Sequence, residues 1–191
     1  MTVCIFAASS SRINNEFALT AAKLGSFLAK SGHDVVFGGG GIGLMGKLAD
    51  AVLSNGGKIT GVIPAFMKEE GWGHKRLTKM IVTADMGERK KQMFALSDAV
   101  IALPGGVGTL EELTEAITLK QLSLFDGPII ILNTRGFYNS LTEFLDNMVE
   151  NHFLRSEHKG IWEVVSTPEE AVAALKNKDR GNEEWRKIAK I

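Results

Sequence analysis

Residues 104–112, with the sequence PGGVGTLEE, combine a glycine-rich loop with two adjacent glutamates. The loop follows an apolar run and leads directly into a helical pattern, so its backbone N–H groups meet the positive end of a helix dipole. The N-terminus of a helix binds phosphate or carboxylate. Because the loop contains no lysine, we expect the bound anion to be the size of a monophosphate. The candidate phosphate-binding residues are Gly105, Gly106, Gly108 and Thr109.

The two glutamates permit two interpretations. Thr109 and Glu112 have the spacing of a capping box, in which the threonine hydroxyl accepts a hydrogen bond from a first-turn amide and the glutamate reaches back to the cap. Glu111 suits the first turn of a helix because its charge opposes the helix dipole. The alternative is that Glu112 is a catalytic carboxylate beside the bound anion. Local sequence alone favours the capping box.

A second suggestive stretch, residues 84–91 (ADMGERKK), follows another apolar run. Asp85 and Glu88 have the spacing of a helix cap, which places Arg89 in the first turns of the helix. Arg89 either pairs with Asp85 on a solvated face, or its guanidinium reaches a ligand site and binds a phosphate or a catalytic carboxylate. On local grounds Lys90 is a surface residue.

Residues 38–48, GGGGIGLMGKL, resemble two nucleotide-binding patterns without completing either. The glycine spacing matches a dinucleotide-binding loop, but no acidic residue follows about 20 positions later. Leu48 stands where a P-loop carries the hydroxyl that holds magnesium, so both NAD binding and ATP hydrolysis are disfavoured. Four successive glycines favour close approach of the backbone to a ligand over tight packing alone. The candidates here are Gly39, Gly40 and Gly43.

Short β-rich runs alternate with longer helical patterns along the chain, as is typical of a parallel α/β sheet. The predicted strands are residues 3–8, 34–37, 59–64, 79–82, 99–103, 129–132 and 162–165. The predicted helices are residues 15–30, 44–54, 86–97, 110–125, 140–151 and 169–176. We expect a Rossmann-like open sheet with helices on both faces in a single domain, residues 1–178, followed by a C-terminal tail, residues 179–191. Residues 65–78 are predicted to form a long loop that covers a site or a partner surface.

Loops that leave the carboxyl ends of parallel strands lie along one edge of the sheet, where ligands bind. Four stretches follow predicted strands in this way and should converge: residues 8–12, 38–47, 83–91 and 104–109. In the first stretch, Ser9 and Ser10 either donate to a phosphate or ribose or cap the first helix.

The composition disfavours several classes of partner. The 22 basic residues equal the 22 acidic ones, so the net charge of zero gives no general attraction to nucleic acid or to an anionic membrane. The four histidines lack metal-ligand spacing, and we expect no metal. The single cysteine, Cys4, lies in an apolar run, which indicates a buried thiol in a reducing cytoplasm. No apolar stretch reaches membrane-spanning length, so we expect a cytoplasmic protein.

Four segments together resemble the LONELY GUY (LOG) family across residues 3–176. They are GGGGIGLMG, ERKKQM, SDAVIALPGGVGTLEEL and QLSLFDGPIIILNTRGFYNSL. Members of this family are cytokinin riboside 5′-monophosphate phosphoribohydrolases, many of which were once labelled lysine decarboxylases. The arginine–lysine pair followed by P-G-G-x-G-T-x-x-E is a specific signature.

The resemblance implies that Arg89 and Glu112 are catalytic and that residues 105–109 bind the phosphate. Lys90 matches the same signature, and Met86 lies in the same stretch, so both join the candidate substrate-binding residues. The resemblance also implies a homodimer with its sites near the interface. No cofactor is expected, because no lysine stands out as an anchor for pyridoxal phosphate.

This chain departs from the usual family pattern at three places. Ala8 replaces the glycine that ends the first strand, Gly87 replaces a histidine two positions before the arginine, and residues 118–121 read TLKQ where the family usually has TWAQ.

The implied activity is hydrolysis of the N-glycosidic bond of a cytokinin-type or adenine nucleoside 5′-monophosphate, which releases the free base and ribose 5-phosphate. The alternative is a non-catalytic carrier that resembles molybdenum-cofactor carrier proteins. Single-stranded DNA binding is disfavoured by the neutral charge. The helix predicted at residues 110–125 carries apolar residues on more than one stripe, which is consistent with burial against a second subunit.

Overall fold

Seven parallel strands form one sheet in the order β4-β3-β2-β1-β5-β6-β7. This computed structural model describes residues 1–176 and Trp185. The predicted tail, residues 179–191, lies outside the described residues except for Trp185. The strands are β1 (Thr2–Phe6), β2 (Asp34–Phe37), β3 (Ile59–Pro64), β4 (Lys79–Thr83), β5 (Ala99–Ala102), β6 (Ile129–Leu132) and β7 (Trp162–Val165).

The strand order reverses between β1 and β5. The chain winds outward from β1 through β2 to β4, then returns to the other side of β1 and continues through β5, β6 and β7. At such a switch point the loops after the two central strands diverge to opposite faces of the sheet and leave a crevice at their carboxyl ends. The segments after β1 and β5 flank this crevice.

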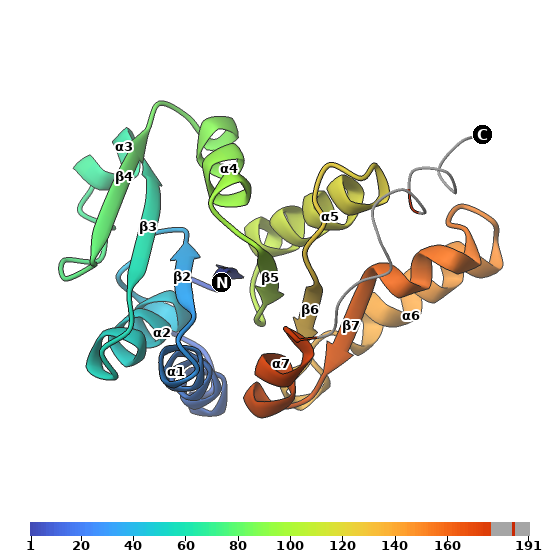
Figure 1. Cartoon of the computed structure of the whole chain (residues 1–191), viewed down its shortest axis with the longest axis horizontal. Coiled ribbons are helices and arrows are strands. Elements are labelled where there is room, and N and C mark those ends of the chain that lie inside the picture. The colour runs from blue at the N-terminus through green and yellow to red at the C-terminus, as the bar shows by residue number, and fades with distance from the viewer. Residues whose placement is uncertain (177–184, 186–191) are drawn as a thin grey trace.

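Helices cover both faces of the sheet (Figure 1). The α-helices are α1 (Asn15–Lys30), α2 (Gly43–Ser54), α3 (Ala65–Glu69), α4 (Met86–Ala95), α5 (Val107–Gln121), α6 (Asn139–Glu150) and α7 (Pro168–Ala174), and the 3-10 helices are η1 (Thr134–Gly136) and η2 (Ser156–Ile161). Helix α1 packs against α2 and α7 on one face, whereas α4 and α5 lie on the other face.

Each face of the sheet carries its own hydrophobic core, because successive side chains of a strand point to opposite sides. In β1, Val3 and Ile5 join the core beneath α1, α2 and α7. Cys4 and Phe6 join the core beneath α4 and α5. Both cores are built mainly from buried aliphatic residues, so the central strands form a rigid platform for the loops at their carboxyl ends.

The predicted fold class is confirmed, and most element boundaries agree within two residues. Two differences matter for the site. Helix α5 begins at Val107 and ends at Gln121, earlier at both ends than predicted. The predicted long loop contains the short helix α3, and Gly73 bridges to Gly40 within it.

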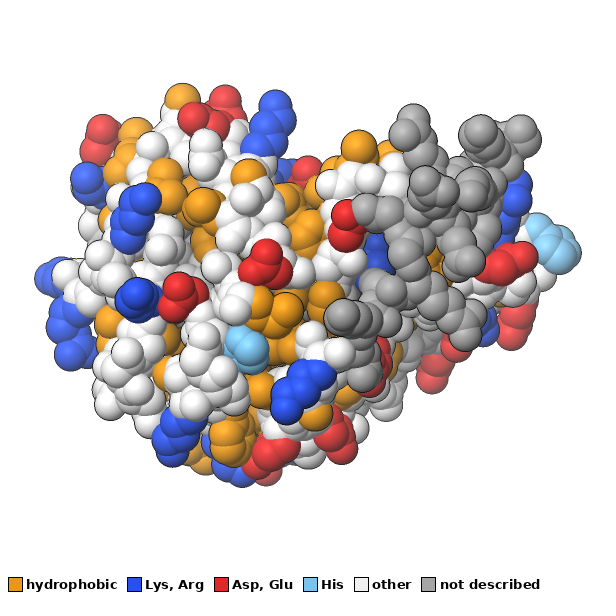
Figure 2. All heavy atoms as spheres, viewed as in Figure 1, with side chains coloured by type: hydrophobic (Ala, Val, Ile, Leu, Met, Phe, Trp, Pro, Cys, Tyr) orange, Lys and Arg blue, Asp and Glu red, His pale blue; other side chains and the backbone are white. Residues whose placement is uncertain are grey.

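Charged side chains of both signs are interspersed over the face seen in Figure 2. None of the helices among the described residues is both long and apolar enough to cross a membrane.

Candidate active site

A cavity of about 290 Å³ lies at the switch point, beside the carboxyl ends of β1 and β5. This volume is close to the lower end of the range for small-molecule sites, roughly 300 to 1,000 Å³. Its polar lining residues are Ser9, Ser10, Arg89, Thr109, Glu111 and Glu112. Its apolar and glycine lining residues are Ile5, Ala7, Ala8, Gly38, Met45, Met67, Met86, Gly106 and Gly108. The four stretches predicted to converge therefore do so, and α3 contributes Met67 as well.

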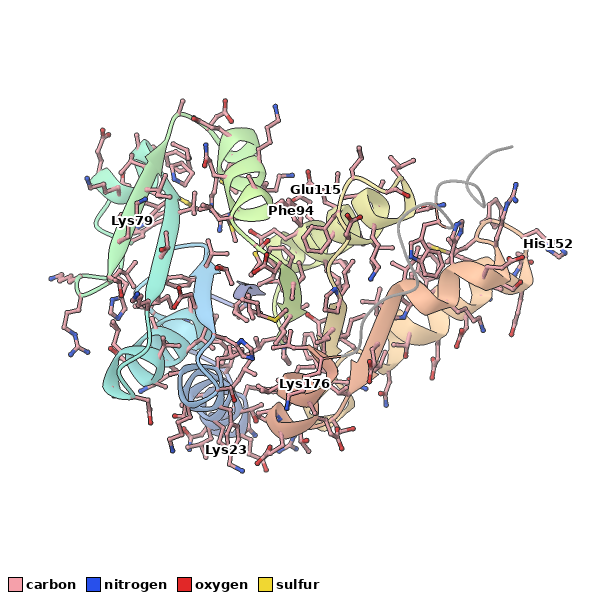
Figure 3. All side chains as sticks on the ribbon, viewed as in Figure 1. Lys23, Lys79, Phe94, Glu115, His152 and Lys176 are labelled. Carbon is pink, nitrogen blue, oxygen red and sulfur yellow. The ribbon has the colours of Figure 1, made fainter. Side chains whose placement is uncertain are left out.

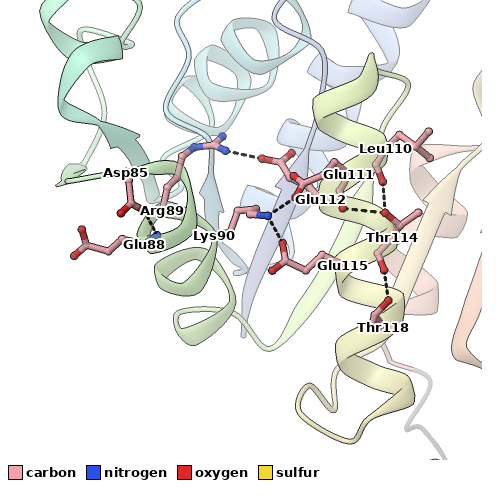
Figure 4. A network of polar contacts seen from close by, with 10 residues as sticks. All are labelled: Asp85, Glu88, Arg89, Lys90, Leu110, Glu111, Glu112, Thr114, Glu115 and Thr118. Carbon is pink, nitrogen blue, oxygen red and sulfur yellow. Dashed lines mark hydrogen bonds and ion pairs between the residues drawn. The ribbon is translucent and has the colours of Figure 1, made fainter. Parts of the chain in front are cut away.

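Arg89 and Glu112 form a buried ion pair that joins α4 to α5 (Figure 4). Arg89 Nη1 donates to Glu112 Oε1 at 2.7 Å, and Arg89 Nε donates to the carbonyl oxygen of Val62 at 3.1 Å. The predicted alternative, an ion pair between Arg89 and Asp85, is wrong. Asp85 instead caps α4, as expected, by accepting a hydrogen bond from the Glu88 amide at 2.8 Å.

The capping box predicted for Glu112 is also wrong. Helix α5 begins at Val107, with Gly106 as the residue before it, so Thr109 lies inside the first turn. Gly106 adopts an extended backbone that lets the helix start directly after the glycine pair. The Glu112 side chain is directed to Arg89 and is not engaged at the helix cap.

Two glycines make room for polar side chains of the site. A Cβ atom on Gly38 would lie 2.0 Å from Arg89 Nη2, and a Cβ atom on Gly105 would lie 2.1 Å from Thr109 Oγ1. Both distances are far below van der Waals contact. The absence of a side chain at Gly38 is therefore required for the observed position of the Arg89 guanidinium.

The other glycines of the run pack against protein. A Cβ atom on Gly40 would lie 2.6 Å from Met45 Cε, and one on Gly43 would lie 2.5 Å from the Ser9 carbonyl carbon. Gly39 has a φ of +76° and faces the side chain of Ile63. Tight packing, the alternative that the sequence analysis ranked second, accounts for these three contacts. Gly38, which the sequence analysis did not select, lines the cavity instead.

The N-termini of α2 and α5 differ in how far they are open to a ligand. The first amides of α2, those of Leu44 and Met45, donate to the Ala8 carbonyl oxygen at 2.9 and 3.3 Å. In α5 the Leu110 amide donates to the Gly106 carbonyl oxygen at 3.0 Å. The amides before it belong to the first turn, where an α-helix offers no internal acceptor. The N-terminus of α5 is therefore the better anion site.

Ser9 and Ser10 also line the cavity. Their predicted alternative role as a cap of α1 is wrong, because Asn14 caps that helix by accepting from the Glu16 amide at 2.9 Å. Both hydroxyls therefore lie beside the cavity, within the crevice that the strand order creates.

The Lys90 side chain extends toward α5. Its ammonium group contacts the carboxylates of Glu111 and Glu115, the latter at 2.7 Å. The cavity lining includes Glu111 but not Lys90. Lys90 was predicted to bind substrate, and in this structure its ammonium group pairs with two acids of α5.

Burial raises the pKa of Glu112 above the usual glutamate range, and the nearby Arg89 guanidinium offsets part of this rise. Cys4 lies beneath the pair, and burial raises the pKa of its thiol well above its ordinary value. The thiol is therefore neutral and buried, as predicted. A carboxylate with a raised pKa and an adjacent cation is suited to general base catalysis or to stabilisation of a developing positive charge.

Two of the four histidines have buried side chains. His74 Nε2 lies 3.2 Å from Asp50 Oδ1, and its side chain is almost fully buried. His158 is buried beside Trp185. Within residues 1–176 and Trp185, no group of three or more His, Cys, Asp or Glu side chains is arranged to hold a metal ion.

Met45 and Met67 line the cavity together with Met86 but were not among the predicted site residues. Met45 follows the glycine run at the edge of the sheet where ligands bind, and this position could have identified it as a residue of the site. Met67 lies on α3, within the segment predicted to cover a site, but nothing in its local sequence distinguishes it.

Comparison with known proteins identifies the family of this chain. Residues 45–175 match a protein family described as possible lysine decarboxylase. The cytokinin riboside 5′-monophosphate phosphoribohydrolase LOG1 of Arabidopsis thaliana is 42% identical over 166 residues, which cover 87% of this chain and 77% of the relative. The chain belongs to the LOG family. Another LOG relative, the probable cytokinin riboside 5′-monophosphate phosphoribohydrolase LOGL6 of Oryza sativa subsp. japonica, is 39% identical over 173 residues, or 91% of this chain and 69% of the relative.

The LOG fold also occurs in proteins of a different kind. The molybdenum cofactor carrier protein of Chlamydomonas reinhardtii superposes with a TM-score of 0.68 over 92% of this chain and 95% of that one. The two sequences are 21% identical. At this level of identity the likeness shows a shared fold alone.

Proposed function

We propose that this LOG-family chain hydrolyses the N-glycosidic bond of a nucleoside 5′-monophosphate and releases the free base and ribose 5-phosphate. The observation that carries the proposal is the buried Arg89–Glu112 pair in the same cavity as the open N-terminus of α5. The relatives named as phosphoribohydrolases support the same reaction.

Glu112 is proposed to act at the ribose. Breaking the bond to the base develops positive charge on the sugar, and a carboxylate beside it stabilises that charge and accepts a proton from the attacking water. Arg89 keeps the carboxylate oriented, since its guanidinium donates to Glu112 Oε1 and is itself fixed by the Val62 carbonyl oxygen.

The 5′-phosphate is proposed to bind at residues 106–109, where glycines leave the first-turn amides of α5 accessible. Ser9 and Ser10 line the same cavity and are suited to donate to phosphate or ribose oxygens. The side chains of Met45, Met67 and Met86 offer an apolar and adaptable surface for the base. Binding the phosphate away from the reacting carbon fixes the ribose beside Glu112.

The direct test is incubation of the purified protein with AMP and with N6-prenylated AMP, followed by chromatography of the free base. Glu112→Gln should lower kcat by about 100-fold to 10,000-fold. Glu143→Gln, a matched change at an exposed position on α6, should leave kcat unchanged. Failure of the wild-type protein to release base from a panel of nucleoside monophosphates would refute the proposal.

The names of the relatives also favour a cytokinin precursor as the substrate and a role in cytokinin biosynthesis. A kcat/KM that is higher for N6-prenylated AMP than for AMP supports this finer proposal. A preference for unmodified AMP contradicts it and leaves the hydrolysis itself intact.

The carrier alternative predicts tight binding of a phosphorylated pterin without turnover of any nucleotide. The similarity to a molybdenum cofactor carrier concerns the fold alone, whereas the named relatives at about 40% identity favour the enzyme. Calorimetry with a phosphorylated pterin, run beside the hydrolysis assay, separates the two.

A homodimer is proposed from the outer face of α5 and the segment after it. Val107, Leu110, Leu122 and Leu124 are exposed there, with Val107 84% and Leu124 70% accessible. Exposed apolar groups in one region commonly mark a protein interface. Light scattering at micromolar concentration should give the mass of a dimer, and the mass of a single chain would contradict it.

A cytoplasmic location is proposed from the single buried thiol, which is compatible with a reducing compartment. Fractionation of cells that express the tagged chain tests it.

A further inference from the structure

Lys90 follows Arg89 in the sequence and makes a second connection between α4 and α5. Its ammonium group contacts Glu111 and also lies 2.7 Å from Glu115 Oε2. Glu115 projects from α5 toward α4, one helical turn beyond Glu111 (Figures 3 and 4). The Lys90 side chain is 17% exposed, so most of its stem is packed between the helices.

Three carboxylates crowd the first turns of α5. Glu112 points to Arg89, while Glu111 lines the cavity itself and Glu115 lies one turn further along. Like charges near a carboxylate favour its protonated form, and they repel an anion that approaches the same helix end. A nucleoside monophosphate bound at residues 106–109 would meet this negative charge directly.

Lys90 is the cation that contacts two of these acids. Hydrogen bonds to Glu111 and Glu115 raise the pKa of Lys90, so its charge persists across the neutral range. Arg89 cannot also neutralise Glu111 and Glu115, because its guanidinium donates to Glu112 and to the Val62 carbonyl oxygen.

We propose that Lys90 is a positioning residue of the hydrolase site: by neutralising Glu111 and Glu115 it keeps Glu112 ionised and the adjacent anion site open to the substrate phosphate. In this role Lys90 does not contact the substrate. It acts on the site through the charges of Glu111 and Glu115. The assignment rests on the proposed nucleotide hydrolysis for its kinetic part, but its electrostatic part is measurable without turnover.

The ionisable groups around Glu112 belong to α4, α5 and β1. Arg89 and Lys90 act from α4 and lower the pKa of Glu112, whereas Glu111 acts from α5 itself and raises it. Cys4 approaches from β1, but its buried thiol is neutral. After removal of Lys90, Arg89 is therefore the remaining cation near Glu112. The negative charges of Glu111, which lines the cavity, and of Glu115, one turn away, are then no longer neutralised.

The kinetic experiment compares Lys90→Met with Lys91→Met. Lys91 is the next residue of α4 and is exposed, so the two substitutions remove the same charge from one helix. Lys90→Met should move the acid limb of the kcat/KM profile to higher pH. At pH 6 this gives a loss of about threefold to tenfold, with a smaller loss at pH 8. Lys91→Met should match the wild type.

Two further variants separate charge from packing. Lys90→Arg keeps the cation and should retain the wild-type profile. Lys90→Met combined with Glu111→Gln removes the opposing charge as well and should return the acid limb toward the wild-type position. An acid limb that stays in place in Lys90→Met, or that fails to return in the double variant, overturns the proposal.

A second measurement is independent of activity. Carbon-13 NMR of selectively labelled glutamate carboxyl groups, with Glu112 assigned from its Gln variant, follows the titration of Glu112 directly. Glu112 should titrate at higher pH in Lys90→Met and at lower pH in Glu111→Gln than in the wild type. Unchanged titration of Glu112 in folded Lys90→Met overturns the proposal, and so does unchanged titration in Glu111→Gln. If Lys90→Met does not fold, the Glu111→Gln result alone decides between these outcomes.

The two readouts also distinguish the proposals from each other. A wild-type protein that releases no base from any nucleotide refutes the hydrolase. A shifted Glu112 titration in that same protein still supports the electrostatic role of Lys90.

Discussion

Replacement of Arg89 by methionine is expected to destabilise the fold strongly at high pH and weakly at low pH. Methionine retains much of the length and apolar packing of the arginine stem, but it leaves the Glu112 carboxylate buried without a cation. The substitution also removes the donor to the Val62 carbonyl oxygen.

The magnitude follows from the geometry of the pair. The two side chains are 8% and 9% exposed, and their closest atoms are 2.7 Å apart. Two unit charges about 4 Å apart attract by about 4 kcal/mol at an effective dielectric constant of about 20. Loss of one partner from a buried ion pair costs about 3 to 5 kcal/mol, because the remaining charge is desolvated and uncompensated. We expect a loss of about 3 kcal/mol in the free energy of unfolding at pH 8.

The sign of the pH dependence comes from Glu112. Burial already raises its pKa, and loss of Arg89 removes the main influence that lowers it. The folded variant then binds a proton that the unfolded chain has released, so stability falls as pH rises through the folded-state pKa. The destabilisation should shrink as pH is lowered toward the unfolded-state value of about 4.3.

Urea unfolding at pH 5 and pH 8, followed by tryptophan fluorescence, measures this difference. Arg89→Met, Glu112→Gln and the double variant form a cycle in which the double variant has no charge at this pair. At pH 8 the double variant should lose about 2 kcal/mol less than the sum of the single variants. Equal losses for Arg89→Met at both pH values, or additive losses in the cycle, would refute the reasoning.

Three other substitutions test separate features. Gly38→Ala places a Cβ atom 2.0 Å from Arg89 Nη2, so kcat/KM should fall about 100-fold with an unchanged circular dichroism spectrum. Tyr138→Phe removes the hydroxyl that donates to the Leu103 carbonyl oxygen at 2.7 Å, and urea unfolding should show a loss of about 1 to 2 kcal/mol. Burial lowers the pKa of Lys120 to about 8, so the folded wild type releases a proton above pH 8 while the unfolded chain keeps it. The stability of Lys120→Met relative to wild type should therefore fall by about 2 kcal/mol between pH 7 and pH 10, after allowance for solvent screening, and pH-dependent calorimetry checks it.

The LOG fold could be predicted from local patterns to a large extent. Strands β2, β3, β6 and β7 have the predicted boundaries, and so does α1. The reason is physical: buried parallel strands are short apolar runs, and an amphipathic helix repeats its apolar residues every three to four positions. The strand alternation also predicted that the loops after the strands would meet at one edge.

The start of α5 and the direction of its carboxylates could not be predicted in the same way. Thr109 and Glu112 satisfy the spacing of a capping box, and a local rule has no access to an arginine 23 positions earlier in the chain. The cation that binds Glu112 reaches it only because α4 and α5 pack on the same face of the sheet. Glu112 pairs with Arg89 and not with the helix cap, because its buried carboxylate is out of reach of water and needs a charged partner.

Sequence by itself determined the alternation of strands and helices and the glycine loop that precedes a helix, and the family resemblance of its motifs selected Arg89 and Glu112 as candidate catalytic residues. Tertiary structure alone decided their pairing, the need for glycine at position 38, and the engagement of Lys90 by two acids of α5. The difference lies in range. Propensity and periodicity act over a few neighbouring residues, whereas burial and ion pairing depend on which distant segments the folded sheet brings together.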